Sequence, residues 1–149
     1  MIAYLDTSAV VPLLVAEPAS PACRRLWDEA DDVVSCRLTY VEAAAALAQA
    51  NWTGRLDAAQ HEQARTLLDA LWAELDVVEV DDELVRAAAA AAHECGLRGY
   101  DAVQCVAAEQ LLDDDLVAAA GDQRLLSAWR SRGIAVYDTG ARYDTGARG

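Results

Sequence analysis

Short apolar runs alternate with longer amphipathic stretches along the whole chain. The runs have the length of buried strands and end at polar or turn-forming residues; they cover residues 2–5, 33–36, 77–80, 116–120 and 134–137. The stretches between them have the apolar spacing of helices; they cover residues 7–15, 22–30, 38–51, 58–75, 81–95, 100–112 and 123–131. Strands that alternate with helices favour a parallel sheet covered on both faces. We therefore predict one three-layer α/β/α sandwich with about five parallel strands.

Several residues mark the ends of these elements. Asp57 is a good N-cap for the helix that follows it, and Pro12 limits or kinks the first helix. The chain ends in a direct repeat, with residues 137–142 and 143–148 both reading Tyr-Asp-Thr-Gly-Ala-Arg. Two copies of six residues are too short for a repeat architecture. We expect one folded domain over residues 1–137 and a short polar tail over residues 138–149.

Composition narrows the class of protein. Twelve basic and 25 acidic residues give a formal net charge of −13, which argues against a broad basic face for nucleic acid or anionic lipid. No apolar run approaches the roughly 18 residues of a membrane span, and the start lacks the charged and apolar regions of a signal peptide. We expect a cytoplasmic protein without membrane contact. The four cysteines form no C-x-x-C pair, so we expect small buried side chains rather than zinc ligands or disulfides.

Position selects four acids from the 25. Asp6 and Asp122 each follow an apolar strand, where parallel α/β sheets form ligand sites. Glu42 is the one charge in an Ala-rich helix, and Asp101 opens a helix after the break at residues 96–99. If the four carboxylates converge, each pair in contact repels by about 1 to 4 kcal/mol, so a divalent cation is required to neutralise them. Hard oxygen ligands of this kind favour Mg²⁺ or Mn²⁺. The competing interpretation is that the aspartates only cap helices and that Glu42 is a solvated helix residue.

The motifs around these acids resemble a known family. They are Asp6-Thr7-Ser8 after the first strand, Glu42 in residues 38–42, Gly99-Tyr100-Asp101-Ala102, and Asp122 in residues 120–126. In this order they are similar to a PIN-domain ribonuclease, specifically a VapC-type toxin of a type II toxin–antitoxin pair, from Ile2 to about Tyr137. The family pattern has Thr two residues before the fourth acid, where this chain has Ala120.

The resemblance implies a five-stranded parallel sheet and Mg²⁺-dependent endonucleolytic cleavage of RNA, in which metal-activated water hydrolyses a phosphodiester bond. It implies Asp6 and Asp101 as metal ligands, with Glu42 and Asp122 completing the catalytic pocket. Thr7 and Ser8 are candidates either to support Asp6 or to contact substrate, and Arg124 is a candidate substrate contact. It also implies a VapB-like antitoxin whose basic arm reaches the pocket, and a homodimer or larger toxin–antitoxin assembly formed with the helical pair at residues 38–75.

An acidic RNA-cutting enzyme needs arginines near the pocket to guide phosphates. The candidates are Arg24, Arg25, Arg98, Arg124, Arg130 and Arg132, and the competing interpretation for each is a scattered surface arginine. Aspartyl-phosphate phosphatases and receiver domains need a lysine, and this chain has none. The remaining alternative is a catalytically silent PIN-fold binding module whose acidic pocket takes up a partner's arginine.

Overall fold

The computed structural model describes residues 1–111 and 113–140. Within them a parallel five-stranded sheet has the order β3-β2-β1-β4-β5. The strands are β1 (Ile2–Leu5), β2 (Asp32–Cys36), β3 (Asp76–Val78), β4 (Leu116–Ala120) and β5 (Ala135–Asp138). The helices are α1 (Thr7–Leu14), α2 (Ser20–Glu29), α3 (Arg37–Trp52), α4 (Ala58–Trp72), α5 (Asp82–Cys95), α6 (Gly99–Glu109) and α7 (Gln123–Ser131).

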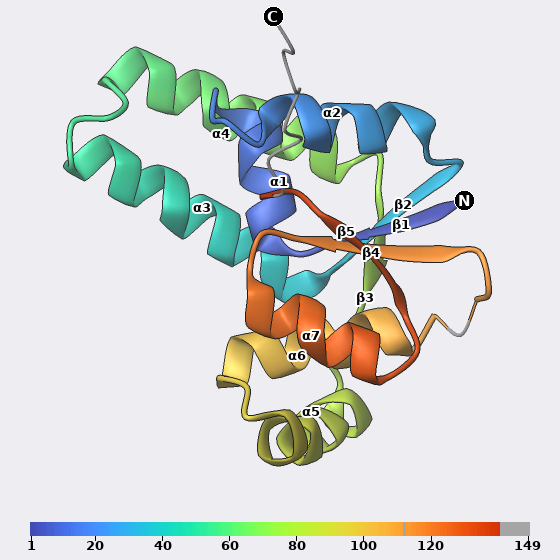
Figure 1. Ribbon diagram of the computed structural model, residues 1–149. Coiled ribbons are helices and arrows are strands. Elements are labelled where there is room, and N and C mark those ends of the chain that lie inside the picture. The colour runs from blue at the N-terminus through green and yellow to red at the C-terminus, as the bar shows by residue number, and fades with distance from the viewer. Residues whose placement is uncertain (112, 141–149) are drawn as a thin grey trace, which may run out of the picture.

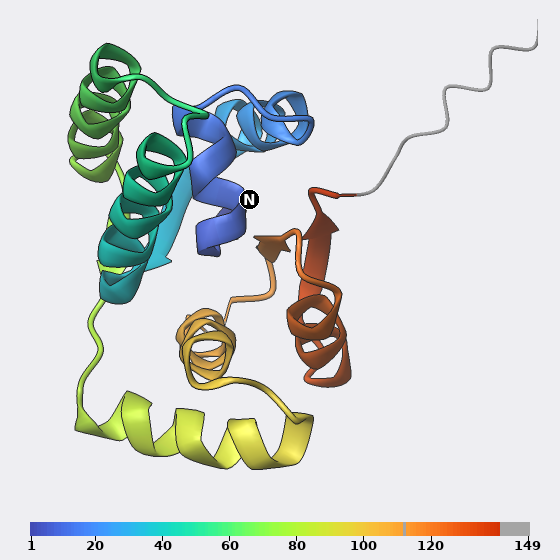
Figure 2. The same cartoon turned by 90° about the vertical axis from the view of Figure 1, so that its left-hand side faces the viewer.

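Helices cover both faces of the sheet, with α1–α4 on one side and α5–α7 on the other (Figures 1 and 2). Successive side chains of a strand point to opposite faces. Accordingly, Tyr4 lies in the core beneath α5–α7, whereas Ala3 and Leu5 lie in the core beneath α1–α4. The predicted three-layer α/β/α sandwich is confirmed.

Each predicted strand and helix is present in the described part of the chain, with ends that differ by a few residues. Asp57 caps α4 in a capping box, since its carboxylate accepts from Gln60 N and its own N–H donates to the Gln60 side chain. Pro12 lies inside α1, which ends shortly afterwards at Leu14. The cysteines are free thiols, and all but Cys95 are buried.

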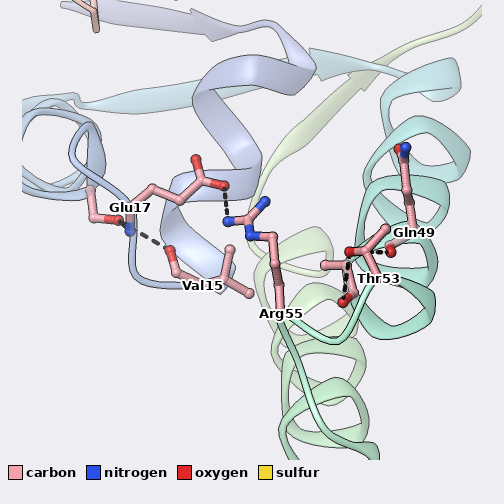
Figure 3. Close-up of polar contacts among 7 residues, drawn as sticks. Val15, Glu17, Gln49, Thr53 and Arg55 are labelled. Atoms are coloured by element: carbon pink, nitrogen blue, oxygen red, sulfur yellow. Dashed lines mark hydrogen bonds and ion pairs between the residues drawn. The ribbon is translucent and has the colours of Figure 1, made fainter.

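The hairpin of α3 and α4 is tied to the segment that follows α1. Arg55, in the turn of the hairpin, donates to Glu17 at 3.5 Å (Figure 3). Thr53 closes the end of α3 by donating its hydroxyl to the carbonyl of Gln49 at 3.0 Å (Figure 3). The Arg55–Glu17 contact links the turn of this hairpin, which extends away from the sheet, to the segment after α1 (Figure 1).

The centre of the sheet sets where a site can form. β1 pairs with β2 on one side and with β4 on the other, so the chain crosses in opposite directions from β1. The carboxyl edge at such a switch point is where open α/β sheets bind ligands. Asp6 lies there, with its N–H donating to Ala119 O of β4 at 3.0 Å.

The sheet ends within the repeated hexapeptide. β5 extends to Asp138, and buried Thr139 donates its N–H to Ala120 O at 3.0 Å. The second copy of the repeat lies outside the described residues. Among the helices that the structure describes, none combines the length and the hydrophobicity that a membrane span requires.

Candidate active site

Asp6 is the most buried of the four candidate acids. It is only 6% exposed, and it caps α1 by accepting from Ser8 N at 3.2 Å and from Ser8 Oγ at 2.6 Å. Ser8 Oγ in turn accepts from Gly121 N at 2.8 Å, which joins the ends of β1 and β4. Burial raises the pKa of Asp6 to about 6, the Ser8 donors oppose the rise, and the charge of Glu42 adds to it.

Glu42 reaches the same edge from α3. Its Oε1 accepts from Thr7 Oγ1 at 3.0 Å and from the side-chain amide of Gln104 at 2.9 Å. Thr7 follows β1 directly, whereas Gln104 lies in α6. Three elements distant in the sequence therefore meet at this carboxylate.

Asp101 and Asp122 lie in the first turn of α6 and at the start of α7. Asp122 caps α7 by accepting from Arg124 N at 2.8 Å and from Leu125 N at 3.2 Å. The pKa of Asp101 is raised by burial, then by the charges of Asp122 and Glu42. Asp6 and Asp122 are thus helix caps, but both also lie beside other acids, so capping alone does not account for their positions.

The four acids form a continuous electrostatic chain at the carboxyl edge of the sheet. Asp6 interacts with Glu42, Glu42 with Asp101, and Asp101 with Asp122. In the part of the chain that the structure describes, none of the four takes part in an ion pair. No cationic side chain among the described residues therefore forms an ion pair that would offset the repulsion among these acids.

A divalent cation fits this donor set. Over residues 1–111 and 113–140, no three acidic, histidine or cysteine side chains are gathered closely enough to hold a metal ion among themselves. Mg²⁺ characteristically takes one or two carboxylates and keeps several waters, so it does not need such a group. The predicted ligand pair of Asp6 and Asp101 is compatible with that preference, because both carboxylates are hard oxygen donors and both interact electrostatically with Glu42.

Two of the candidate arginines lie beside the acids. Arg98 and Arg124 act on Asp101 and lower its pKa against the effect of its acidic neighbours. Neither forms an ion pair with any described residue, so both guanidinium groups are available to phosphate oxygens. Arg132, by contrast, is held by Glu94 and Glu109 at 2.9 and 2.6 Å.

Sequence reasoning did not find Gln104 and Tyr4. Gln104 is 1% exposed and contacts Glu42, while Tyr4 donates its hydroxyl to the amide oxygen of Gln104 at 2.5 Å. One signal was available: Gln104 is a lone amide among the apolar residues of α6. A buried amide in such a position needs hydrogen-bond partners.

The fold and the site define a parallel α/β protein with an acidic site at the carboxyl edge of its sheet. A family model for the PIN domain matches residues 3–127. Ribonuclease VapC49 of Mycobacterium tuberculosis (strain ATCC 25618 / H37Rv) is 35% identical over 133 residues, covering 89% of this chain and 92% of that protein. Ribonuclease VapC47 of M. tuberculosis (strain CDC 1551 / Oshkosh) is 30% identical over 143 residues, covering 93% and 97%.

Among solved structures, FitAB bound to an IR36 DNA fragment matches with a TM-score of 0.71 at 15% identity, covering 95% of this chain and 96% of the matched chain. That similarity shows the fold alone. With the match over residues 3–127, this chain belongs to the PIN-domain family, and its relatives there are VapC-type ribonucleases.

Proposed function

We propose that this protein is a Mg²⁺-dependent endoribonuclease that acts as the toxin of a toxin–antitoxin pair. The observation that carries the proposal is the chain of four acids from Asp6 to Asp122, brought together from four elements without an ion-pair partner among the described residues. The names of the VapC relatives support ribonuclease activity. Mn²⁺ is an expected substitute, since the same oxygen ligands suit both ions.

Each residue has a part that follows from its position. Asp6 and Asp101 are the proposed metal ligands, and Glu42 and Asp122 complete the acidic pocket. A divalent cation held there would lower the pKa of a bound water and offset charge on the phosphate. Ser8 holds the Asp6 carboxylate through its hydroxyl, so that this carboxylate is already oriented. Thr7 holds Glu42 in the same way.

Arg98 and Arg124 are the proposed phosphate contacts. They flank Asp101 and form no ion pair within the described residues, which leaves their guanidinium groups free for bidentate contacts with phosphate oxygens. Two local cations at the pocket make the net charge of −13 compatible with RNA binding, because steering depends on charge near the site.

The expected protein partner is a VapB-like antitoxin with a basic arm. Solved structures similar in fold include VapBC2 of Rickettsia felis bound to a promoter DNA fragment and FitAcB of Neisseria gonorrhoeae. On this chain the hairpin of α3 and α4 leaves apolar side chains uncovered, with Trp52 83% exposed and Val41 56% exposed. These side chains support the proposal that the hairpin takes part in a homodimer or in antitoxin binding.

A catalytically silent module that only binds a partner's arginine is the second candidate. All four acids are present and are linked by pairwise charge interactions, and the named relatives are ribonucleases, so the observations favour the enzyme. The two candidates differ in one measurable property: only the enzyme cleaves RNA in a metal-dependent manner.

The test is cleavage of a mixed RNA substrate by purified protein in Mg²⁺ and in EDTA. Wild type should cleave in Mg²⁺ and not in EDTA, and Asp101→Asn should lose cleavage. Asp82→Asn is the matched control, because Asp82 is an exposed acid in the first turn of α5. Equal cleavage by wild type and Asp101→Asn would contradict the proposal, as would Mg²⁺-dependent stabilisation without any cleavage of RNA.

A further inference from the structure

A buried polar network lies directly beneath the acidic site. Its centre is Gln104, whose amide nitrogen donates to Glu42 Oε1 and to Thr39 Oγ1, both at 2.9 Å. Its amide oxygen accepts from the Tyr4 hydroxyl at 2.5 Å. Both N–H donors of the side-chain amide are therefore used. Its carbonyl oxygen also has a partner, and the side chain is buried from solvent.

The network determines which of the two possible orientations the Gln104 side-chain amide adopts. Reversing it would turn the amide oxygen toward the Glu42 carboxylate, so that two acceptors would face each other without a hydrogen between them. The hydroxyl of Tyr4 stabilises the observed orientation by donating to the amide oxygen. The Tyr4 ring itself is fully buried and packs edge-on against Trp129, with 6.0 Å between ring centroids.

The network also reaches the backbone that leads into Asp6. The Thr39 and Ser35 hydroxyls lie 2.8 Å apart, and Ser35 Oγ donates to the carbonyl of Leu5 at 2.7 Å. Leu5 is the last residue of β1 and directly precedes Asp6. The same set of hydrogen bonds therefore contacts both the Glu42 carboxylate and the strand end that carries Asp6.

We propose that Gln104, oriented by Tyr4, is a positioning residue for Glu42; this inference rests on the proposed ribonuclease function. Gln104 and Thr7 both donate to Oε1, whereas Oε2 of Glu42 receives no hydrogen bond from the described residues. One carboxylate oxygen is thus anchored and the other is left for the pocket. Gln104 acts through Glu42 and does not itself touch substrate.

The first test is independent of catalysis. The side-chain amide of Gln104 gives a pair of ¹H–¹⁵N signals in the metal-free protein, assigned by their loss in Gln104→Met. Glu42→Gln and Tyr4→Phe should each shift these signals, because each removes or reverses one hydrogen bond of the amide. Asp57→Asn, remote from the site and still able to cap α4, should leave them unchanged. Unshifted signals in Glu42→Gln would overturn the proposal.

The second test is a double-mutant cycle on RNA cleavage. Gln104→Met keeps the side-chain length and removes the hydrogen bonds; it should lower kcat about 10- to 100-fold with little change in KM, the range expected for a misplaced catalytic group. Tyr4→Phe should lower kcat less. Combined with Glu42→Gln, Gln104→Met should cause no further loss, because both changes act on one unit.

A control on the same helix separates positioning from loss of stability. Val106→Ala removes a buried contact of α6 without touching the network and should keep its kcat below its melting temperature. A double mutant that loses the full Gln104→Met factor beyond Glu42→Gln would overturn the inference. If wild type cleaves no RNA, the proposed function fails, while the amide signals still decide whether Gln104 holds Glu42.

Discussion

Replacing Asp6 by asparagine should stabilise the metal-free protein at neutral pH. Burial raises the pKa of Asp6 from 3.8 to about 6, so the folded state binds its proton more tightly than the unfolded state does. At pH above 6, keeping this carboxylate ionised in the fold costs about 3 kcal/mol. The cost declines as the pH falls through 6, and it is absent below about 4, where the carboxyl group is protonated in both states.

The asparagine retains part of the local structure. Its side-chain oxygen can still accept from Ser8, but it loses the charge-assisted share of those bonds, about 1 kcal/mol. The net gain at pH 7.5 is then about 2 kcal/mol, which raises the melting temperature of a chain of this size by about 4 to 8 °C. The gain should shrink steadily between pH 7 and pH 4.

Thermal melts in EDTA across this pH range measure the effect, with Asp57→Asn as the control. Asp57 is an exposed helix cap, so its replacement by another good cap should shift the melting temperature little at any pH. Added Mg²⁺ should raise the melting temperature of wild type and not that of Asp6→Asn. The reasoning would be refuted by an Asp6→Asn variant that is no more stable than wild type at pH 7.5, or whose advantage does not change with pH.

Three further predictions follow from single contacts. The affinity of the inactive Asp101→Asn protein for RNA should fall steeply as the salt concentration rises. Adding Arg98→Ala or Arg124→Ala to it should each reduce the steepness of log K against log salt by about one, whereas Arg86→Ala should leave it unchanged. Asp57→Ala should lower the free energy of unfolding by about 1 kcal/mol in urea titrations, because it removes the capping box of α4. Gly121→Ala should lower the melting temperature, since its Cβ would lie 3.3 Å from the hydroxyl of buried Thr139; an unchanged value would mean that Thr139 moves freely.

The strands and helices could be predicted because each leaves a local signal. The run Ile2–Leu5 ends abruptly at Asp6, and the alternation of apolar runs with helical periods implied a parallel sheet. Adjacent parallel strands then place the residues that follow them at one edge, so the neighbourhood of Asp6 and Asp122 followed from topology. Their roles as metal ligand and pocket residue remain predictions.

The supporting network could not be predicted in the same way. Gln104 lies 100 residues from Tyr4 and 62 from Glu42 along the chain, and no periodicity links such positions. Whether a lone polar residue in an apolar helix faces the core depends on how α6 packs. Which arginines lie near the acidic site could not be predicted for the same reason. Arg132 forms ion pairs with residues of α5 and α6, whereas Arg98 lies beside the acids.

Because the four acids form no ion pair within the described residues, we expect a divalent cation and an arginine of a partner to compete for them. Repulsion among Asp6, Glu42 and Asp101 is relieved by any cation placed between them, whether a divalent ion or the guanidinium of an antitoxin arm. Both cations would use the same oxygens, so each should weaken the other's binding by an equal factor. Calorimetric titration of an arginine-containing basic peptide into the Asp101→Asn protein should show little binding. In wild type, binding should weaken as Mg²⁺ is raised, beyond what an equal ionic strength of NaCl produces. Peptide affinity that is insensitive to Mg²⁺ would place the arginine away from the four acids.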